Sequence, residues 1–159
     1  EKNIAKKIAV SLSKKIPLLY IEPPFGSLGS RFAKMVNENA GQLSFYNHFP
    51  ELRHNEIMGW GKKSPLKSNF SLIFLRDNKD FSQMEEEINE IQNAICSNFK
   101  IIELRAIGES KLARFFSLQY MTDMIAYYMA ILVAKDPSIT PALKDLKKKL
   151  RERSVIPYS

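Results

Sequence analysis

Cysteine is almost missing from this sequence, since Cys96 is the only one among 159 residues. A single cysteine cannot form a disulfide within the chain or a cysteine-based zinc site. The sequence also lacks a basic segment followed by an apolar run and a small-residue cleavage site, which together mark a secretory signal peptide. We therefore expect a reducing, cytoplasmic setting.

Glycine and proline are scarce as well, with 6 and 8 residues. These low numbers exclude collagen-like and low-complexity chains. With 45% hydrophobic and 26% charged residues, the composition fits a single compact domain over residues 1–159. Because the chain begins with Glu1 and not with Met, we expect it to be a fragment or a processed product.

The sequence has no long uninterrupted apolar run. Its most apolar stretch, residues 112–134, contains Arg114, Gln119 and Asp123, whereas a helix that crosses a bilayer needs roughly 20 nearly continuous apolar residues. We interpret this stretch as a buried core helix, and we expect no membrane partner.

Acidic residues are outnumbered, because 24 Lys and Arg stand against 17 Asp and Glu and give a net charge of +7. A positive balance favours nucleic acid, anionic lipid or a phosphorylated small molecule, and charge alone does not choose among them. The most basic segment, residues 144–153, follows a leucine stripe at Leu143, Leu146 and Leu150. This pattern is typical of a docked helix with a solvated face, so we expect no nucleic-acid partner.

Helical and strand patterns alternate along the chain. The predicted helices are 4–12, 31–40, 51–58, 84–95, 109–134 and 140–151, and the predicted strands are 16–21, 43–46, 72–75 and 101–107. Ser30 is the predicted N-cap of the second helix, and Gly41 is its predicted end. This order predicts an α/β fold in which helices cover both faces of a parallel sheet.

Ligands of such sheets bind at the carboxyl ends of the strands, which here points to residues 22–30, 47–54 and 76–81. The first segment contains Gly26-Ser27-Leu28-Gly29-Ser30, which we interpret as a loop with N–H groups available to a phosphate. It matches neither of the two common phosphate-loop patterns, so its support for phosphate binding is weak.

Two residues have side chains suited to proton transfer. His54 lies in a polar cluster, residues 49–56, and a histidine beside carboxylates can titrate near neutrality. Glu38 lies near a predicted helix C-terminus, where a carboxylate opposes the macrodipole by roughly 0.3 to 1 kcal/mol. The alternatives are a helix histidine held by a neighbouring carboxylate and a solvated surface glutamate. His48 and His54 match no zinc spacing, so we expect no metal.

Four segments in this order resemble one known family: Asn37–Ala40 (NENA), Phe49–Ile57 (FPELRHNEI), Leu112–Leu118 (LARFFSL), and Asp136-Pro137 followed by Thr140-Pro141. They are similar to the carboxyl-terminal half of the bifunctional phosphoglucose/phosphomannose isomerases, which belong to the sugar isomerase (SIS) superfamily. The resemblance runs over nearly the whole chain, from residue 16 to residue 147.

The resemblance implies a three-layer α/β/α SIS fold with a parallel sheet of about five strands. It also implies an isomerase that needs no metal and no cofactor and interconverts glucose 6-phosphate or mannose 6-phosphate with fructose 6-phosphate through a cis-enediol. The expected partners are the phosphorylated hexose, an amino-terminal SIS half with a Ser/Thr-rich phosphate loop, and a second copy in a homodimer. We expect the chain alone to be inactive.

The resemblance also assigns site residues. Glu38 would be the base that moves a proton between C1 and C2, while His54 and Lys147 would assist ring opening. Thr140 would bind substrate and leave room for either C2 epimer, and Arg31 is a further candidate for substrate binding. The alternative is a non-catalytic SIS module that binds a sugar phosphate for regulation, with a nucleic-acid binder as a distant third.

The chain departs from the family pattern at two positions. Arg53 stands where the family usually has Asn before the histidine, and Gly41 stands where it usually has Lys after NENA. Both changes alter the charge close to a candidate catalytic residue.

Overall fold

The computed structural model describes residues 3–22, 25–61, 64–79, 82–96 and 101–153. Its sheet has four parallel strands in the order β2-β1-β3-β4. The strands are β1 (Ile16–Ile21), β2 (Phe45–His48), β3 (Phe70–Arg76) and β4 (Ile101–Arg105). The described residues thus form the four strands predicted from local pattern, where the family resemblance implied about five.

Three helices cover one face of the sheet. They are α1 (Ile4–Leu12), α2 (Gly26–Met35), which continues as the π-helix η1 (Val36–Ala40), and α6 (Lys111–Leu132). Leu19 and Ile21 of β1 point into the core on this side, together with Phe32 of α2 and Ile125 of α6. The alternation of side chains along β1 leaves Tyr20 for the opposite face.

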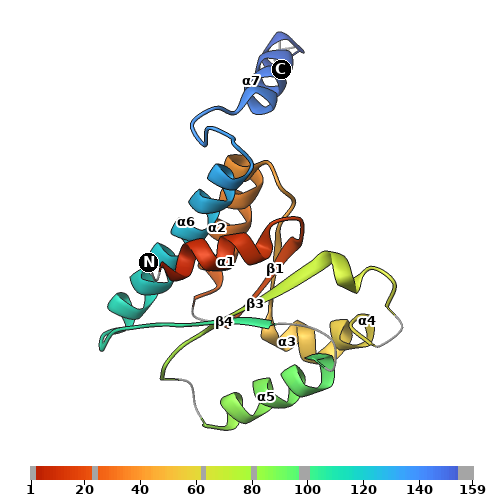
Figure 1. Ribbon diagram of the computed structural model, residues 1–159, viewed down its shortest axis with the longest axis vertical. Helices are drawn as coiled ribbons and strands as arrows, with labels where there is room; N and C mark the ends of the chain where they lie inside the picture. The colour runs from red at the N-terminus through yellow and green to blue at the C-terminus, as the bar shows by residue number, and fades with distance from the viewer. Residues whose placement is uncertain (1–2, 23–24, 62–63, 80–81, 97–100, 154–159) are drawn as a thin grey trace, which may run out of the picture.

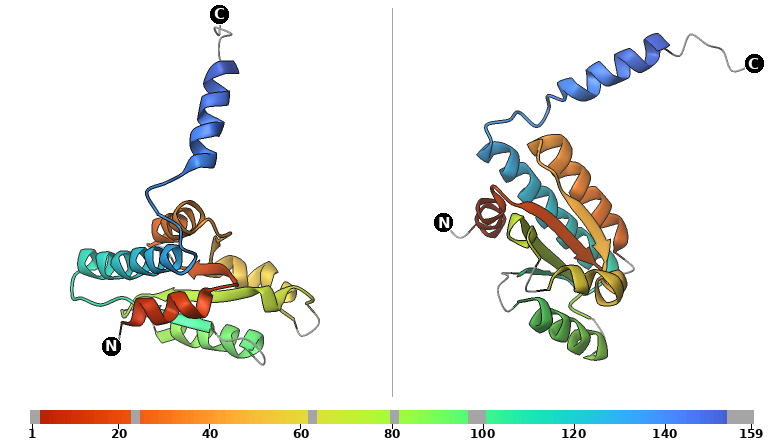
Figure 2. Two further views of the ribbon diagram at one scale, coloured as in Figure 1. Left: turned by 45° about the horizontal axis from the view of Figure 1, so that its top comes forward. Right: turned by 90° about the vertical axis from the view of Figure 1, so that its right-hand side faces the viewer.

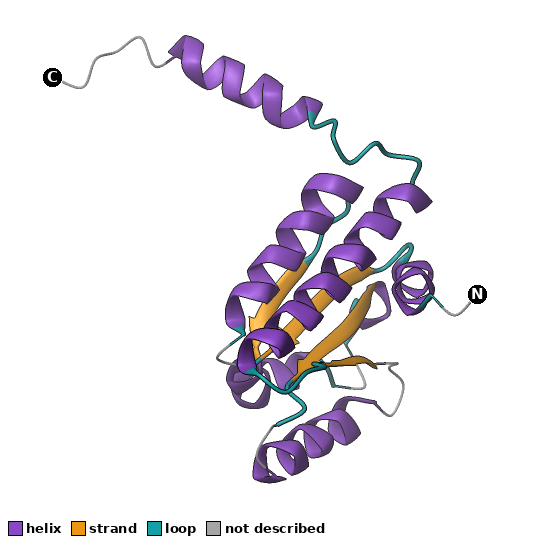
Figure 3. Cartoon of the chain, turned by 90° about the vertical axis from the view of Figure 1, so that its left-hand side faces the viewer, coloured by secondary structure: helices purple, strands orange, loops and turns teal. Residues whose placement is uncertain are grey.

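The opposite face is covered by a broken helical segment and by one longer helix (Figure 1). The segment consists of α3 (Phe49–Glu51), the π-helix η2 (Leu52–Glu56) and α4 (Ile57–Gly59), and the longer helix is α5 (Ser82–Cys96). Their buried side chains form a second core with Tyr20, Leu72 and Phe74 of the sheet. The predicted three-layer α/β/α arrangement is confirmed (Figure 3).

The short helix η3 (Lys67–Asn69) precedes β3, and α7 (Pro141–Arg153) ends the described chain. Figure 2 shows α7 standing away from the three layers. All of residues 141–152 are exposed, including the leucine stripe of α7. The prediction of a helix here is confirmed, but the expectation that it docks on the core is wrong for this structure.

The long helix α6 is buried along one side only. Leu118, Ile125 and Met129 lie in the core, whereas its outer side carries an exposed apolar stripe of Leu112, Phe116, Tyr120, Tyr127 and Ile131. The prediction of a buried core helix therefore holds for one side of α6 and is wrong for the other. Among the described helices, none combines the length and apolar character that a membrane crossing requires.

The structure corrects the sequence prediction around α2. The helix begins at Gly26, with Phe25 as its N-cap residue, so Ser30 is not the cap and residues 26–30 are not a loop. Glycine has a packing role here, because a Cβ on Gly29 would lie 2.7 Å from Cδ2 of Tyr46 and 3.2 Å from Cγ2 of Ile21. The glycines that suggested a loop instead allow α2 to lie close to the sheet.

We predict that Gly29→Ala lowers the free energy of unfolding by about 1–3 kcal/mol, because the new methyl group overpacks the contact between α2 and the sheet. Gly59→Ala is the matched control, since a Cβ there meets nothing within 4 Å. Urea unfolding followed by circular dichroism measures both variants. Equal stability of the two would contradict the close-packing role of Gly29.

Candidate functional site

Glu38 lies in η1, at the end of α2. The segment is fixed to the amino ends of β1 and β2, because the side-chain amide of Asn37 donates to the Ser44 carbonyl at 3.0 Å and accepts from the Ser44 N–H at 3.2 Å. The Ser44 hydroxyl in turn donates to the Pro17 carbonyl at 3.0 Å. The backbone beneath Glu38 is therefore held while its side chain is exposed.

A groove of about 530 Å³ lies beside Glu38 and includes the predicted residue Thr140. It is lined by Lys34, Asn37, Glu38, Gly41, Lys135, Thr140, Pro141, Ala142 and Leu143. The ammonium of Lys135 donates to the backbone carbonyl of Glu38 at 2.5 Å. Sequence reasoning missed Lys135, which is 97 residues from Glu38 along the chain.

A second groove on the other side of Glu38 lies between α2 and α6. It is also about 530 Å³ in volume and is lined by Ser27, Leu28, Ser30, Arg31, Lys34, Met35, Glu38, Phe115 and Gln119. Arg31 makes a two-pronged contact with Asp123 of α6, with Nε–Oδ1 at 2.9 Å and Nη2–Oδ2 at 2.8 Å. These hydrogen bonds raise the pKa of Arg31. The structure thus brings Arg31, Glu38 and Thr140 to one continuous surface.

Lys147 is not part of this surface. It lies on α7 and is exposed, and it does not line either groove beside Glu38. Thr140 and the first residues of α7 line the first groove. Figure 2 shows that the rest of α7 stands away from the three layers. The structure therefore holds Thr140 near Glu38 and leaves Lys147 apart.

His54 lies on the opposite face of the sheet from Glu38. It is exposed in η2, and its Nδ1 is 3.1 Å from the side-chain oxygen of Asn55, an amide and not a carboxylate. The neighbouring Arg53 pairs with Glu87 of α5. Figure 1 shows α2 on one side of the sheet and α3 and α4 on the other. Because η1 continues α2 and η2 lies between α3 and α4, the sheet separates the two candidate catalytic residues within one chain.

A partly buried hydrogen-bond network anchors the segment that carries His54. The Tyr20 hydroxyl and the Asn47 amide both donate to the Glu56 carboxylate. The indole N–H of Trp60 donates to the Tyr20 hydroxyl at 3.1 Å. Burial, reinforced by the hydrogen bond to Glu56, raises the pKa of Tyr20 well above its ordinary value. The network ties the end of the helical segment to β1 and β2.

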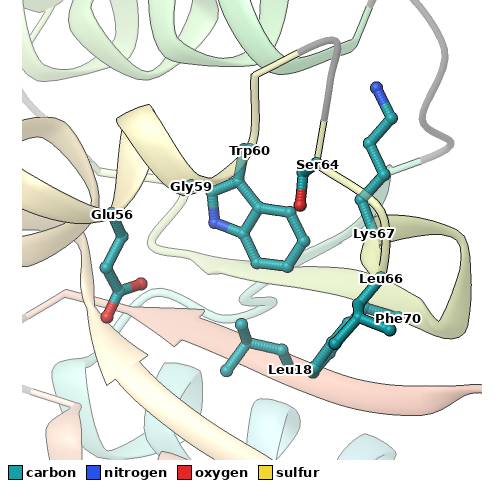
Figure 4. A pocket seen from close by; sticks show the side chains of 8 residues that line it. All are labelled: Leu18, Glu56, Gly59, Trp60, Ser64, Leu66, Lys67 and Phe70. Carbon is teal, nitrogen blue, oxygen red and sulfur yellow. The ribbon is translucent and has the colours of Figure 1, made fainter.

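A cavity of about 320 Å³ lies next to this network (Figure 4). Its walls are mostly apolar, and they are formed by Leu18, Glu56, Gly59, Trp60, Ser64, Leu66, Lys67 and Phe70. The carboxylate at one end of the cavity is already engaged by Tyr20 and Asn47. The cavity therefore offers shape and apolar contact more than acid–base chemistry. Within the described part of the chain, no three His, Cys, Asp or Glu side chains are grouped so as to hold a metal ion.

Comparison with known proteins places the chain in a family. Residues 1–150 match the family model described as the bacterial phospho-glucose isomerase C-terminal SIS domain. The bifunctional phosphoglucose/phosphomannose isomerase of Caldicellulosiruptor bescii is 31% identical over 96% of this chain and 45% of its own length. That of Thermoplasma acidophilum is 31% identical over 94% of this chain and 46% of its own length.

A solved structure has the same fold. A glucose-6-phosphate isomerase-like protein from Thermus thermophilus superposes with a TM-score of 0.66 and 22% identity, over 92% of this chain and 47% of its own. The chain spans about half the length of the curated relatives that it matches.

We predict that Tyr20 keeps its proton in the folded protein at a pH where an unfolded tyrosine, with an ordinary pKa of about 10, has lost it. Because the folded-state pKa is raised, the stabilisation is complete below about pH 10 and is lost as the pH rises above that value. Phenolate absorbance should therefore be equal for the folded wild type and Tyr20→Phe at about pH 11, and should differ by one tyrosine in urea.

The control is Tyr120→Phe, which removes an exposed ring and lowers the absorbance in both states. If Tyr20→Phe lowered the amplitude of the folded protein as Tyr120→Phe does, the network around Glu56 would not hold the Tyr20 proton.

Proposed function

This chain belongs to the family of carboxyl-terminal SIS domains of bacterial phosphoglucose isomerases, and on that premise we propose that it is one half of an aldose–ketose isomerase. The enzyme interconverts glucose 6-phosphate or mannose 6-phosphate with fructose 6-phosphate. The observation that carries the proposal is the surface on which Glu38 lies between Thr140 and Arg31. The single cysteine suits a cytoplasmic setting.

Glu38 acts as the base of the isomerisation. Its carboxylate accepts the proton bound to C2 of the aldose and returns it to C1 of the cis-enediol, while a hydroxyl proton moves between the two oxygens. A positioned carboxylate performs such a transfer without metal. The fixed backbone of η1 supports this role, because it presents the carboxylate at the junction of two grooves.

His54 assists ring opening from a second copy of the chain. Within one chain the sheet lies between His54 and Glu38, so a site that uses both residues combines two chains. The two residues are exposed on opposite faces, as this arrangement requires. The working protein is accordingly a homodimer with two equivalent sites.

An amino-terminal SIS half completes each site by binding the phosphate. The matched relatives are about twice as long as this chain, and α6 presents its exposed apolar stripe beside the groove that contains Arg31 and Glu38. A partner surface that covers this stripe would also exclude water from the groove. Binding energy from the phosphate then holds the reacting carbons in place, and Lys147 joins the site when α7 docks.

We predict that Glu38→Gln lowers kcat by about 10²- to 10⁴-fold, because a positioned acid–base group is lost. The assay uses this chain assembled with its amino-terminal half and fructose 6-phosphate as substrate. Substrate binding should persist, whereas solvent exchange should stop both for the C1 proton of fructose 6-phosphate and for the C2 proton of glucose 6-phosphate.

Glu90→Gln removes an exposed carboxylate of α5 and serves as the control; the chain without its amino-terminal half should show negligible turnover. Residual activity within tenfold of the wild type would refute Glu38 as the base. Sugar-phosphate binding without any turnover in the assembled wild type would instead favour a regulatory SIS module.

We predict that mixing two impaired variants restores activity on the cyclic sugar. His54→Ala should lower the rate on the cyclic sugar more than the rate on an open-chain analogue, and Glu38→Gln should be nearly inactive on both. When the two are unfolded and refolded together, mixed dimers contain one site with Glu38 and His54 both intact, so about one quarter of the wild-type sites return. Mixing Glu38→Gln with itself is the control. No recovery from the mixture would show that both residues act within one chain.

A further inference from the structure

The carbonyl group of Glu38 is bound by a side chain from the far end of the fold. The last carbonyl groups of a helix have no partner within the helix, and η1 ends at Gly41, whose φ is 63°. Lys135 lies in the turn that follows α6 and donates from its ammonium to the Glu38 carbonyl at 2.5 Å. The ammonium thus contacts the same residue that carries the candidate catalytic carboxylate.

Contacts of its backbone and of its ammonium restrict where the Lys135 side chain lies. Its own N–H donates to the Ala130 carbonyl at 3.0 Å, in a turn where Ala134 has a φ of 52°. Its far end passes over Gly41, where a Cβ would lie 3.2 Å from Nζ and 3.6 Å from Cδ. Lys135 is also half-buried, so the ammonium has a restricted range of positions.

The missing side chain at Gly41 makes room for this ammonium. The positive φ of Gly41 is a backbone conformation that glycine adopts at little cost. A Cβ at position 41 would lie 3.2 Å from Nζ of Lys135, so a side chain there would displace the ammonium from its observed position by a few tenths of an ångström. The end of η1 is therefore shaped to receive a cation from α6.

A cation at this point has two physical effects. It offsets the unfavourable placement of a carboxylate near a helix C-terminus. It also stands in the groove that Glu38 and Thr140 line, and the enediol path places negative charge on the oxygens of the substrate. A fixed ammonium in a groove covered by a partner stabilises such charge more strongly than the same group does in water.

We propose that Lys135 is a positioning residue for Glu38, which holds the η1 backbone by its carbonyl and supplies the positive charge that the enediol step needs. This role rests on the proposed isomerase function. Lys has three donors on one compact charge, so the bond to the Glu38 carbonyl leaves two donors of Lys135 for the groove.

The test compares Lys135→Met and Lys135→Arg in the chain assembled with its amino-terminal half. Lys135→Met should lower kcat by about 10- to 100-fold with a change in KM below about threefold, because the lost charge acts on the transition state. Lys135→Arg keeps the positive charge and should restore part of kcat.

Lys111→Met removes an exposed lysine at the other end of α6 and is the matched control. If Lys135→Met does not fold, Lys135→Gln provides a polar side chain without the charge, and its kcat should fall with little change in KM. Thermal unfolding of every variant separates a loss of fold from a loss of rate.

The outcomes separate this inference from the proposed function. An active wild type with unchanged kcat in Lys135→Met would overturn the role of Lys135 and leave the isomerase proposal standing. A lower melting temperature of Lys135→Met with an unchanged kcat would do the same, because it shows a helix cap alone. An inactive assembled wild type would overturn both.

Discussion

The sheet buries both of its faces, and this constraint decides on which side of the fold Arg31, Glu38 and His54 lie. Successive side chains of β1 point to opposite sides, so Leu19 and Ile21 enter one core and Tyr20 enters the other. A parallel sheet needs this double cover, because its crossovers place helices on both faces. Residues on α2 and on η2 are therefore kept apart by the thickness of the sheet, whatever their distance along the chain.

The same constraint explains why the two sides contribute different chemistry. On the side of α2 and α6, two grooves lie beside Glu38, and the charged residues Arg31, Glu38 and Lys135 line them. On the other side, Glu56 is turned inward and its oxygens are taken by Tyr20 and Asn47. Glu56 therefore stabilises the fold, and the exposed His54 two residues before it is the group left for solvent or for a second chain.

Local sequence pattern predicted most of the elements, because hydrophobic periodicity follows directly from which face is buried. The helix at 4–12 and the strand at 16–21 agree with α1 and β1. The predicted start of α2 was wrong, since Gly29, a residue type that weakens helices in isolation, is required here by the close contact of α2 with Tyr46 and Ile21. The strand predicted at 43–46 is displaced to Phe45–His48, because Ser44 is held by Asn37 before the ladder begins.

The site could be predicted only as far as its motifs are local. Glu38 and His54 each lie in a short distinctive segment, so resemblance to a family could single them out. The pairing of Arg31 with Asp123 spans 92 residues and that of Lys135 with Glu38 spans 97. Such contacts depend on how α6 packs against α2 and η1, which the amino-acid pattern of either partner does not encode.

The position of α7 bears on the charge of the proposed site. Thr140 lines the groove beside Glu38, whereas Lys147 lies further along a helix whose residues 141–152 are exposed. An amphipathic helix gains most of its stability from burying its apolar stripe, so in the proposed enzyme a surface that covers Leu143 and Leu146 would fix the direction of α7. Such docking would also decide whether the ammonium of Lys147 reaches the substrate, whereas the ammonium of Lys135 is held beside Glu38 by the fold of this chain.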